Sequence, residues 1–179
     1  MFKEKIEAAI ADIQNGKFVI VTDDADRENE GDLIMASEMI TPEAVNFMAK
    51  YARGLICVSV NNDDANRLQL GLMEQKNTSL HETNFTVSID AVKNTTTGIS
   101  AHDRSKTIRL MVDKHSNPED FARPGHIFPI LAKEGGVLRR SGHTEASLEL
   151  AELAGFKPSG VLCEIMAEDG TMLRGEDLI

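Results

Sequence analysis

The densest group of side chains that could carry chemistry lies in residues 23–32, which contain six carboxylates and one arginine, Arg27. This run follows an apolar stretch, residues 18–21, that is typical of a buried strand. Carboxylates crowded at the end of a strand repel one another, and a divalent cation with oxygen ligands is the simplest partner that offsets this repulsion. Arg27 adds a fixed positive charge for an anionic substrate. A solvated acidic loop without a ligand is the alternative.

The acidic run does not fit the EF-hand calcium loop. Counted from Asp26, Gly31 falls correctly at position 6, but Ser37 stands at position 12, where a bidentate glutamate is needed. The pattern therefore excludes an EF-hand and leaves open a divalent-cation site of another kind.

A second group, residues 139–145, combines two arginines with a hydroxyl residue and a glycine at the predicted start of a helix. The N-terminus of a helix offers free backbone N–H groups to an anion, so this segment predicts a phosphate site. It is not a P-loop, because the Gly-x-x-x-x-Gly-Lys spacing is absent. His143 is a candidate metal ligand, and Arg140 with Thr144 could hold the phosphate. A helix cap flanked by surface arginines is the alternative.

Two further residues could transfer protons. His126 lies in a bend bounded by proline and glycine among apolar residues, where burial and neighbours could keep its pKa near neutrality. Glu164 interrupts the apolar stretch 161–166, and burial of that strand face would raise its pKa. A structural histidine and a glutamate at an exposed strand edge are the alternatives.

The elements that would position these residues mix helices and strands without strict alternation. Apolar periodicity and capping residues predict helices near residues 6–13, 42–53, 63–70, 103–112 and 144–154. Strands are predicted at residues 18–22, 33–36, 55–60, 85–89, 127–131 and 161–166, with an irregular polar loop at 71–84. This order predicts an α+β fold, a multilayer sandwich of mixed sheets and helices, in one domain over residues 1–179.

Length, charge and cysteine content limit the class of protein. A chain of 179 residues can bury its own core, and a net charge of −10 argues against binding nucleic acid. Cys57 and Cys163 lie in apolar stretches with no metal-binding spacing, which predicts reduced, buried thiols. No apolar run reaches bilayer length and no signal region is visible, so we expect a cytoplasmic protein that does not enter membranes.

Six segments together resemble the 3,4-dihydroxy-2-butanone 4-phosphate synthase family of riboflavin biosynthesis. They occur in the family's order and cover nearly the whole chain: residues 23–32, 85–91, 96–104, 123–129, 135–146 and 160–164. The resemblance implies a lyase that converts D-ribulose 5-phosphate to L-3,4-dihydroxy-2-butanone 4-phosphate and formate with Mg²⁺ or Mn²⁺. It also implies an α+β sandwich that forms a homodimer, with active sites near the subunit interface.

The resemblance also implies roles for individual residues. Glu28 and His143 would be the metal ligands, and His126 and Glu164 the essential proton-transfer residues, with the order of their proton transfers left open. Abstracting a proton next to a carbonyl needs a base of moderate pKa, and the resulting enediolate needs a cation. The substrate would contact a larger set: Arg27, Glu28, Asp32, Arg140, Ser141, Gly142, His143, Thr144 and Glu164.

The chain departs from the family pattern in two places. Ala25 stands where relatives commonly carry an acidic residue, so position 25 is not expected to be a ligand. After the turn at residues 169–172 the chain stops earlier than relatives usually do, which is expected to change packing only locally. A GTP cyclohydrolase II region with clustered zinc cysteines, fused to this domain in many bacteria, is not found in the sequence, so that activity is not expected.

Two other functions stay open on the sequence. A metal-dependent sugar-phosphate isomerase or aldolase-like lyase would keep the same site, and an isomerase would release no formate. A non-catalytic remnant used for dimerisation or regulation would not need Glu28, His126, His143 and Glu164 together.

Overall fold

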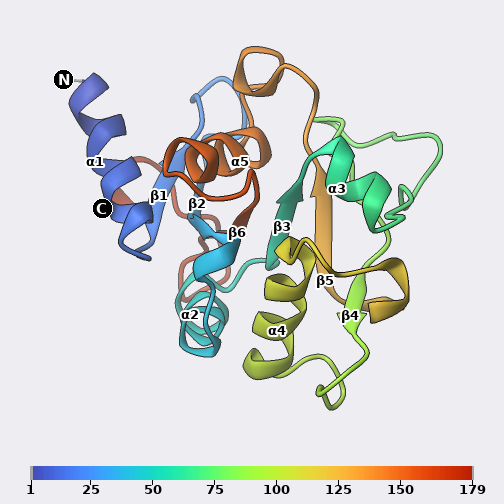
Figure 1. Cartoon of the computed structure of the whole chain (residues 1–179). Coiled ribbons are helices and arrows are strands. Elements are labelled where there is room, and N and C mark those ends of the chain that lie inside the picture. Colours follow the sequence, from blue (N-terminus) through green and yellow to red (C-terminus); the bar gives the residue numbers. More distant parts are fainter. Residues whose placement is uncertain (1, 179) are drawn as a thin grey trace.

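A mixed sheet of six strands, in the order β1-β2-β6-β3-β5-β4, forms the frame of the computed structural model, which describes residues 2–178 (Figure 1). β3 and β5 run parallel, and the other neighbouring strands run antiparallel. The strands are β1 (Val19–Thr22), β2 (Gly31–Ala36), β3 (Cys57–Val60), β4 (Ile89–Ala91), β5 (Phe121–Leu131) and β6 (Gly160–Glu164).

Helices cover both faces of this sheet. On one face α5 packs against β2, β6 and β3, and α1 packs on the outside of α5. On the other face α2 and α4 pack against each other and close the main apolar core. This layering confirms the predicted α+β sandwich. The helices are α1 (Phe2–Gln14), α2 (Pro42–Phe47), α3 (Asn62–Arg67), α4 (Ala101–Val112) and α5 (His143–Leu153).

The side chains of strand β2 point alternately to the two faces of the sheet. Every residue of β2 is buried, because the strand lies inside the sheet with helices on both sides. Leu33 and Met35 enter the main core, whereas Ile34 packs with Leu162 on the α5 face. Side chains alternate along a strand, so Asp32 projects toward the face of Ile34. A carboxylate is thereby carried into the layer between the sheet and α5.

The predicted helix at residues 42–53 is confirmed in extent but is not a regular α-helix throughout. Thr41 caps it by accepting a hydrogen bond from the backbone N–H of Ala44 (3.1 Å). After Phe47 the chain continues as one π-helical turn, Met48–Ala52, and leaves the helix at Arg53, where φ is +70°. The π turn lies directly before the segment that enters β3.

The predicted strand at residues 85–89 is wrong over most of its length. Phe85 and Thr86 form only isolated bridges, and β4 begins at Ile89. The apolar side of this segment is covered, since Ile89 is fully buried and Phe85 and Val87 pack partly buried against the core. The polar side is covered as well. Thr86 and Ser88 are the buried alternate side chains, and their hydroxyls bond to the carbonyl of Pro129 (3.1 Å) and to the N–H of Gly125 (3.1 Å).

Strand β5 is longer than the predicted strand at 127–131, because it begins at Phe121 and continues through Pro124. The pairing with β4 shifts between Ile89 and Asp90, so the stretch that contains Pro124 does not have to donate to the ladder. This bulge determines where His126 lies.

Both cysteines are free, buried thiols, as predicted. Burial raises the pKa of Cys163 to about 12, so its thiol stays protonated at neutral pH. No helix within residues 2–178 has the length and apolar character needed to cross a lipid bilayer.

Candidate active site

The acidic loop is shaped by Asp23, which the sequence reasoning placed in the loop without a role. One oxygen of Asp23 accepts from the N–H of Glu28 (2.9 Å) and from the guanidinium of Arg27 (2.8 Å), and the other accepts from the N–H of Glu30 (2.9 Å). Burial alone would raise the pKa of Asp23, but these backbone hydrogen bonds and Arg27 lower it. Asp23 is therefore a charged organiser of the loop. The signal that could have identified Asp23 is its position directly after a predicted strand, where an aspartate commonly accepts hydrogen bonds from the backbone N–H groups of the following turn.

Asp32 and Glu164 meet where β2 and β6 pair. They are register partners, and both point to the face that carries Ile34 and Leu162. Asp32 is only 3% exposed, and burial, together with the charges of Glu164 and Glu28, raises its pKa well above the ordinary value. Burial also raises the pKa of Glu164, although this carboxylate accepts a hydrogen bond from the N–H of Leu55 (2.8 Å). The sheet end therefore carries two carboxyl groups that resist ionisation.

His143 is the first residue of α5 and brings an imidazole to these carboxylates. Its Nδ1 lies 3.6 Å from Asp32 Oδ1 and 3.9 Å from Glu28 Oε2. Burial lowers the pKa of His143, which favours the neutral, ligating form. Within the described part of the chain, His143 Nε2 and Asp32 Oδ1 are buried without a hydrogen-bond partner. Buried polar atoms normally have partners, so these two atoms carry unmet hydrogen-bonding capacity next to the acidic loop.

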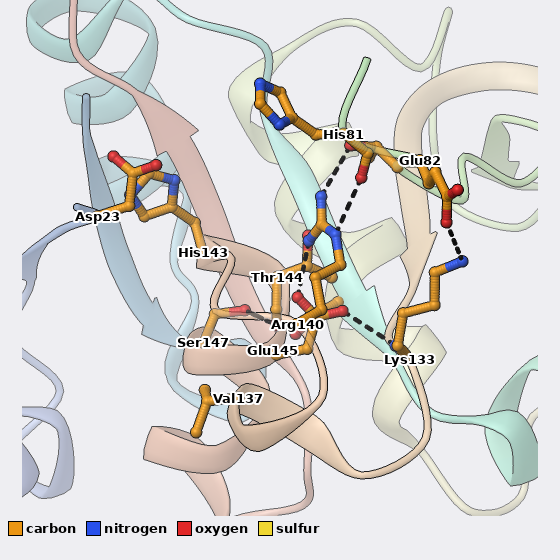
Figure 2. A network of polar contacts seen from close by, with 12 residues as sticks. Asp23, His81, Glu82, Lys133, Val137, Arg140, His143, Thr144, Glu145 and Ser147 are labelled. Carbon is orange, nitrogen blue, oxygen red and sulfur yellow. Dashed lines mark hydrogen bonds and ion pairs between the residues drawn. The ribbon is translucent and has the colours of Figure 1, made fainter. Parts of the chain in front are cut away.

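Arg140 connects the start of α5 to the polar loop at residues 71–84 (Figure 2). Its guanidinium donates to Glu145 Oε2 (2.7 Å), to Thr83 Oγ1 (3.0 Å) and to the carbonyl of His81 (3.2 Å). Glu145 is 1% exposed, and its second oxygen accepts from the N–H of Lys133 (3.0 Å). On the sequence Glu145 belonged to the group at residues 139–145 without a role of its own, and Thr83 was not a candidate, because only the tertiary fold brings the loop to Arg140.

Gly142 makes this placement of Arg140 possible. It is the N-cap of α5, and a Cβ at this position would overlap Arg140 Nη1 and lie 3.0 Å from Glu145 Oε2. Next to it, Thr144 is buried, whereas Ser141 is exposed. A glycine is therefore needed at position 142 because a side chain there would displace the guanidinium of Arg140. The backbone conformation of Gly142 is one that any residue can adopt.

A cavity of about 160 Å³ joins the acidic loop, the strand ends and the start of α5. A hollow of about 730 Å³ lies beside α1 and β1, but no histidine or arginine from residues 2–178 lines it. The smaller cavity holds the reactive groups. The predicted site residues that line it are Arg27, Glu28, Asp32, Arg140, His143, Thr144 and Glu164.

His126 is not among the described residues that line this cavity, although it belongs to the same end of the sheet. Cys57 of β3 is paired with Phe128 on one side and with Leu162 on the other. His126 comes two residues before Phe128 in β5, and Glu164 comes two residues after Leu162 in β6, so both lie at the end of the sheet where β3 begins. The segment that leads into β3 separates His126 from Glu164. The ring of His126 contacts Asp90, which the sequence reasoning also missed, with 2.6 Å between His126 Nδ1 and Asp90 Oδ2.

The donor set of the cavity fits a hard divalent cation. Glu28 supplies carboxylate oxygens at its edge, and His143 supplies a neutral imidazole, which suits Mg²⁺ or Mn²⁺ when water and substrate oxygens complete the coordination. Among residues 2–178 no three or more histidine, cysteine or acidic side chains are already grouped closely enough to hold a metal ion by themselves. The protein thus offers a partial ligand set. The cavity also gathers two arginines for an anion.

Fold and cavity together define a class of α+β protein in which carboxylates, an imidazole and arginines converge at one end of a mixed sheet. Residues 7–179 match the family described as 3,4-dihydroxy-2-butanone 4-phosphate synthase. The chain belongs to this family.

Similar proteins carry names from the same pathway. The chain is 57% identical over 175 residues to the riboflavin biosynthesis protein RibBA of Staphylococcus epidermidis, covering 98% of this chain and 44% of that protein. It is 58% identical over 176 residues to RibBA of Aquifex aeolicus, covering 97% and 43%. The chain therefore spans less than half the length of these relatives.

Solved structures agree with the family and the fold. RibBX of A. baumannii, described as a two-domain 3,4-dihydroxy-2-butanone 4-phosphate synthase, superposes with a TM-score of 0.93 at 48% identity, covering 97% of this chain and 51% of that one. A 3,4-dihydroxy-2-butanone 4-phosphate synthase in complex with two magnesium ions superposes with a TM-score of 0.91 at 43% identity, covering 96% and 85%.

Proposed function

We propose that the protein is a lyase that converts D-ribulose 5-phosphate to L-3,4-dihydroxy-2-butanone 4-phosphate and formate in riboflavin biosynthesis. The observation that carries this proposal is the single cavity in which Glu28, Asp32, His143, Arg140 and Glu164 meet. Family membership supports the reaction, and the cavity offers the groups that enolisation, dehydration, skeletal rearrangement and formate loss require.

Glu28 and His143 are the proposed ligands of Mg²⁺ or Mn²⁺. Their approach to within 3.9 Å and the neutral state favoured for His143 support this assignment. When bound, the cation stabilises the oxyanions that form on adjacent substrate carbons. Before binding, Glu28 is held by Arg27 through a 3.0 Å contact, which keeps its carboxylate at the edge of the cavity.

Glu164 and His126 are the proposed proton-transfer residues. Burial raises the pKa of Glu164, so this carboxyl group can hold a proton closer to neutral pH than an exposed glutamate can. His126 is 41% exposed at the side chain and presents its ring at the same end of the sheet.

The substrate phosphate is assigned to the start of α5. Arg140 and Thr144 line the cavity there, and Ser141 and Gly142 precede the first turn, where backbone N–H groups are available to an anion. Arg27 and Asp32 are assigned to the sugar end, since Arg27 can donate to substrate oxygens and a protonated Asp32 can do the same.

We further propose that residues 1–179 act as one domain that forms a homodimer in the cytoplasm, with the active sites near the subunit interface. Exposed apolar side chains at the site end of the sheet, such as Leu55 (42% exposed), support a protein contact there. The net charge of −10 supports a small-molecule substrate over nucleic acid. Light scattering after size exclusion tests the dimer.

Formate release from D-ribulose 5-phosphate tests the activity. The purified chain with Mg²⁺ is expected to release one formate for each substrate consumed, and EDTA is expected to stop the reaction. Consumption of substrate without formate would favour the sugar-phosphate isomerase. No consumption with either metal would favour a non-catalytic role.

A further inference from the structure

Asp90 contacts His126 at two points. Asp90 Oδ1 accepts a hydrogen bond from the backbone N–H of His126 (2.9 Å), and Asp90 Oδ2 lies 2.6 Å from His126 Nδ1. The carboxylate therefore holds both the main chain and the ring of the same residue. The Asp90 side chain is 13% exposed and that of His126 is 41% exposed, so the contact lies inside the protein while the rest of the ring reaches solvent.

The chemistry of the contact determines which ring nitrogen is available. An ionised carboxylate only accepts hydrogen bonds, so the short contact requires a proton on Nδ1 of His126. The neutral imidazole then carries its lone pair on Nε2, the nitrogen that points away from Asp90. An aspartate that fixes a histidine in this way sets its tautomer and orientation and stabilises the imidazolium that forms when the ring accepts a proton.

The surrounding chain keeps the pair together. The bulge between Ile89 and Asp90 shifts the pairing of β4 with β5 and turns Asp90 toward His126. Gly98, at φ +90°, lies over the pair so closely that a Cβ there would overlap the Asp90 carboxylate and lie 2.7 Å from His126 Nδ1. Asp103 holds this glycine in place, since its Oδ2 accepts from the N–H of Gly98 (3.1 Å) and from the hydroxyl of Thr96 (2.7 Å).

We propose that Asp90 is a positioning residue that fixes His126 as the Nδ1–H tautomer, with Nε2 free for proton transfer. This inference rests on the proposed function, because it takes His126 to be a proton-transfer residue. No covalent step is added: one proton moves between substrate and Nε2, and Asp90 keeps its own contact to Nδ1 throughout.

The tautomer can be measured without substrate. Long-range ¹H–¹⁵N NMR spectra of the full chain distinguish the two neutral tautomers of each of the five histidines, and the His126→Asn variant identifies the signal of His126. At an alkaline pH where the ¹⁵N shifts show the neutral ring, the wild type is expected to show His126 with its proton on Nδ1. A wild-type signal from the Nε2–H tautomer would overturn the proposal, whatever the activity of the enzyme.

The Asp90→Asn variant tests the catalytic consequence. The amide can donate to Nδ1, which shifts His126 toward the Nε2–H tautomer and removes the free lone pair. We expect kcat for formate release to fall about hundredfold, in the range of a general acid–base contribution, with KM within about threefold. Asp113→Asn is the matched control, since Asp113 also accepts from a histidine, the backbone N–H of His115, but does not line the cavity.

A double variant separates this inference from the function it rests on. Asp90→Asn combined with His126→Asn is expected to be no slower than His126→Asn alone, because Asp90 acts only through His126. An additional large loss in the double variant, or an unchanged kcat in Asp90→Asn, would contradict the positioning role. If the wild type releases no formate, the proposed function fails, whereas the NMR result still decides what Asp90 does to His126.

Discussion

Asp32 and Glu164 face each other as register partners across β2 and β6, on the sheet face that α5 covers. Burial raises the pKa of both groups, and the charge of Glu164 adds to the shift of Asp32. Two carboxyl groups placed in this way cost stability when both are ionised, and a bound cation or a substrate donor relieves that cost. This end of the sheet therefore holds unfavourable charge in the absence of such a partner.

Replacing Glu28 by Gln is expected to reduce formate release by more than a hundredfold while the fold is kept. The amide preserves the shape of Glu28 but removes the negative charge that a cation needs, and it relieves repulsion by Asp32. The melting temperature of the metal-free protein should be unchanged or higher. Glu119→Gln, at an exposed turn, is the control. A retained rate within about tenfold, roughly 1.4 kcal/mol of barrier, would contradict the role of Glu28.

Replacing Asp32 by Asn is expected to stabilise the metal-free protein at neutral pH. The folded-state pKa of Asp32 lies above its unfolded value, so its protonation favours the folded state. Its contribution to stability is therefore present below about pH 4 and is lost as the pH rises through the folded-state pKa. Urea denaturation in EDTA should show a gain on the order of 1 kcal/mol at neutral pH that shrinks toward pH 4. Asp26→Asn, an exposed position in the same loop, should show no such gain.

Replacing Arg140 by Ala is expected to raise KM for the phosphorylated sugar about tenfold to a hundredfold, with a smaller change in kcat. Arg139→Ala provides the control, because Arg139 is the exposed neighbour in the chain. Glu145→Gln should raise KM through Arg140, whose guanidinium it holds at 2.7 Å. A double-mutant cycle measures this coupling. Additive effects of Arg140→Ala and Glu145→Gln would show that Glu145 does not act through Arg140.

Replacing Gly142 by Ala tests the space beneath Arg140. The added Cβ overlaps Arg140 Nη1, so the guanidinium must move, although the backbone at Gly142 has an ordinary φ of −110°. We expect KM to rise severalfold with little loss of thermal stability. Gly71→Ala is the matched control, because a Cβ there meets no atom within 4 Å. Equal KM values in the two variants would remove Gly142 from the phosphate site.

Adding Mg²⁺ or Mn²⁺ is expected to raise the melting temperature, and EDTA should reverse the effect. A cation at a hundredfold excess over its Kd stabilises the folded state by about 2.7 kcal/mol. His143→Gln should lose this stabilisation, whereas His115→Gln, at an exposed surface position, should keep it. A metal-dependent shift that persists in His143→Gln would place the cation elsewhere.

Most of the fold and most of the residues that line the cavity could be predicted from the sequence, because these features depend on local patterns. Periodicity located α5 and β6, and the position of His143 at a helix start and of Glu164 in an apolar strand identified both side chains before the structure placed them in one cavity. The acidic loop was visible from its composition alone. Each of these features was recognised from the residues next to it in the sequence, without knowledge of contacts between distant segments.

The features that sequence reasoning missed depend on contacts between distant segments. Asp90 and His126 lie 36 positions apart, and only the β4–β5 bulge brings them together. Glu145 lies within the helix that the sequence predicts, but the pattern does not show that its carboxylate contacts Arg140 and the N–H of Lys133. The strand expected at residues 85–89 was wrong because Phe85 and Thr86 make only isolated bridges. An alternating pattern does not reveal whether a neighbouring strand is in register to pair with the segment.

Both arginines of the cavity already bind carboxylates in the absence of substrate, Arg27 with Asp23 and Arg140 with Glu145. Each carboxylate occupies only part of its guanidinium and fixes the direction of the remaining N–H donors, so a substrate oxygen would meet donors that are already oriented. The internal anion also offsets part of each positive charge, which would limit how tightly a phosphorylated metabolite is retained. A departing product would leave neither arginine without a partner.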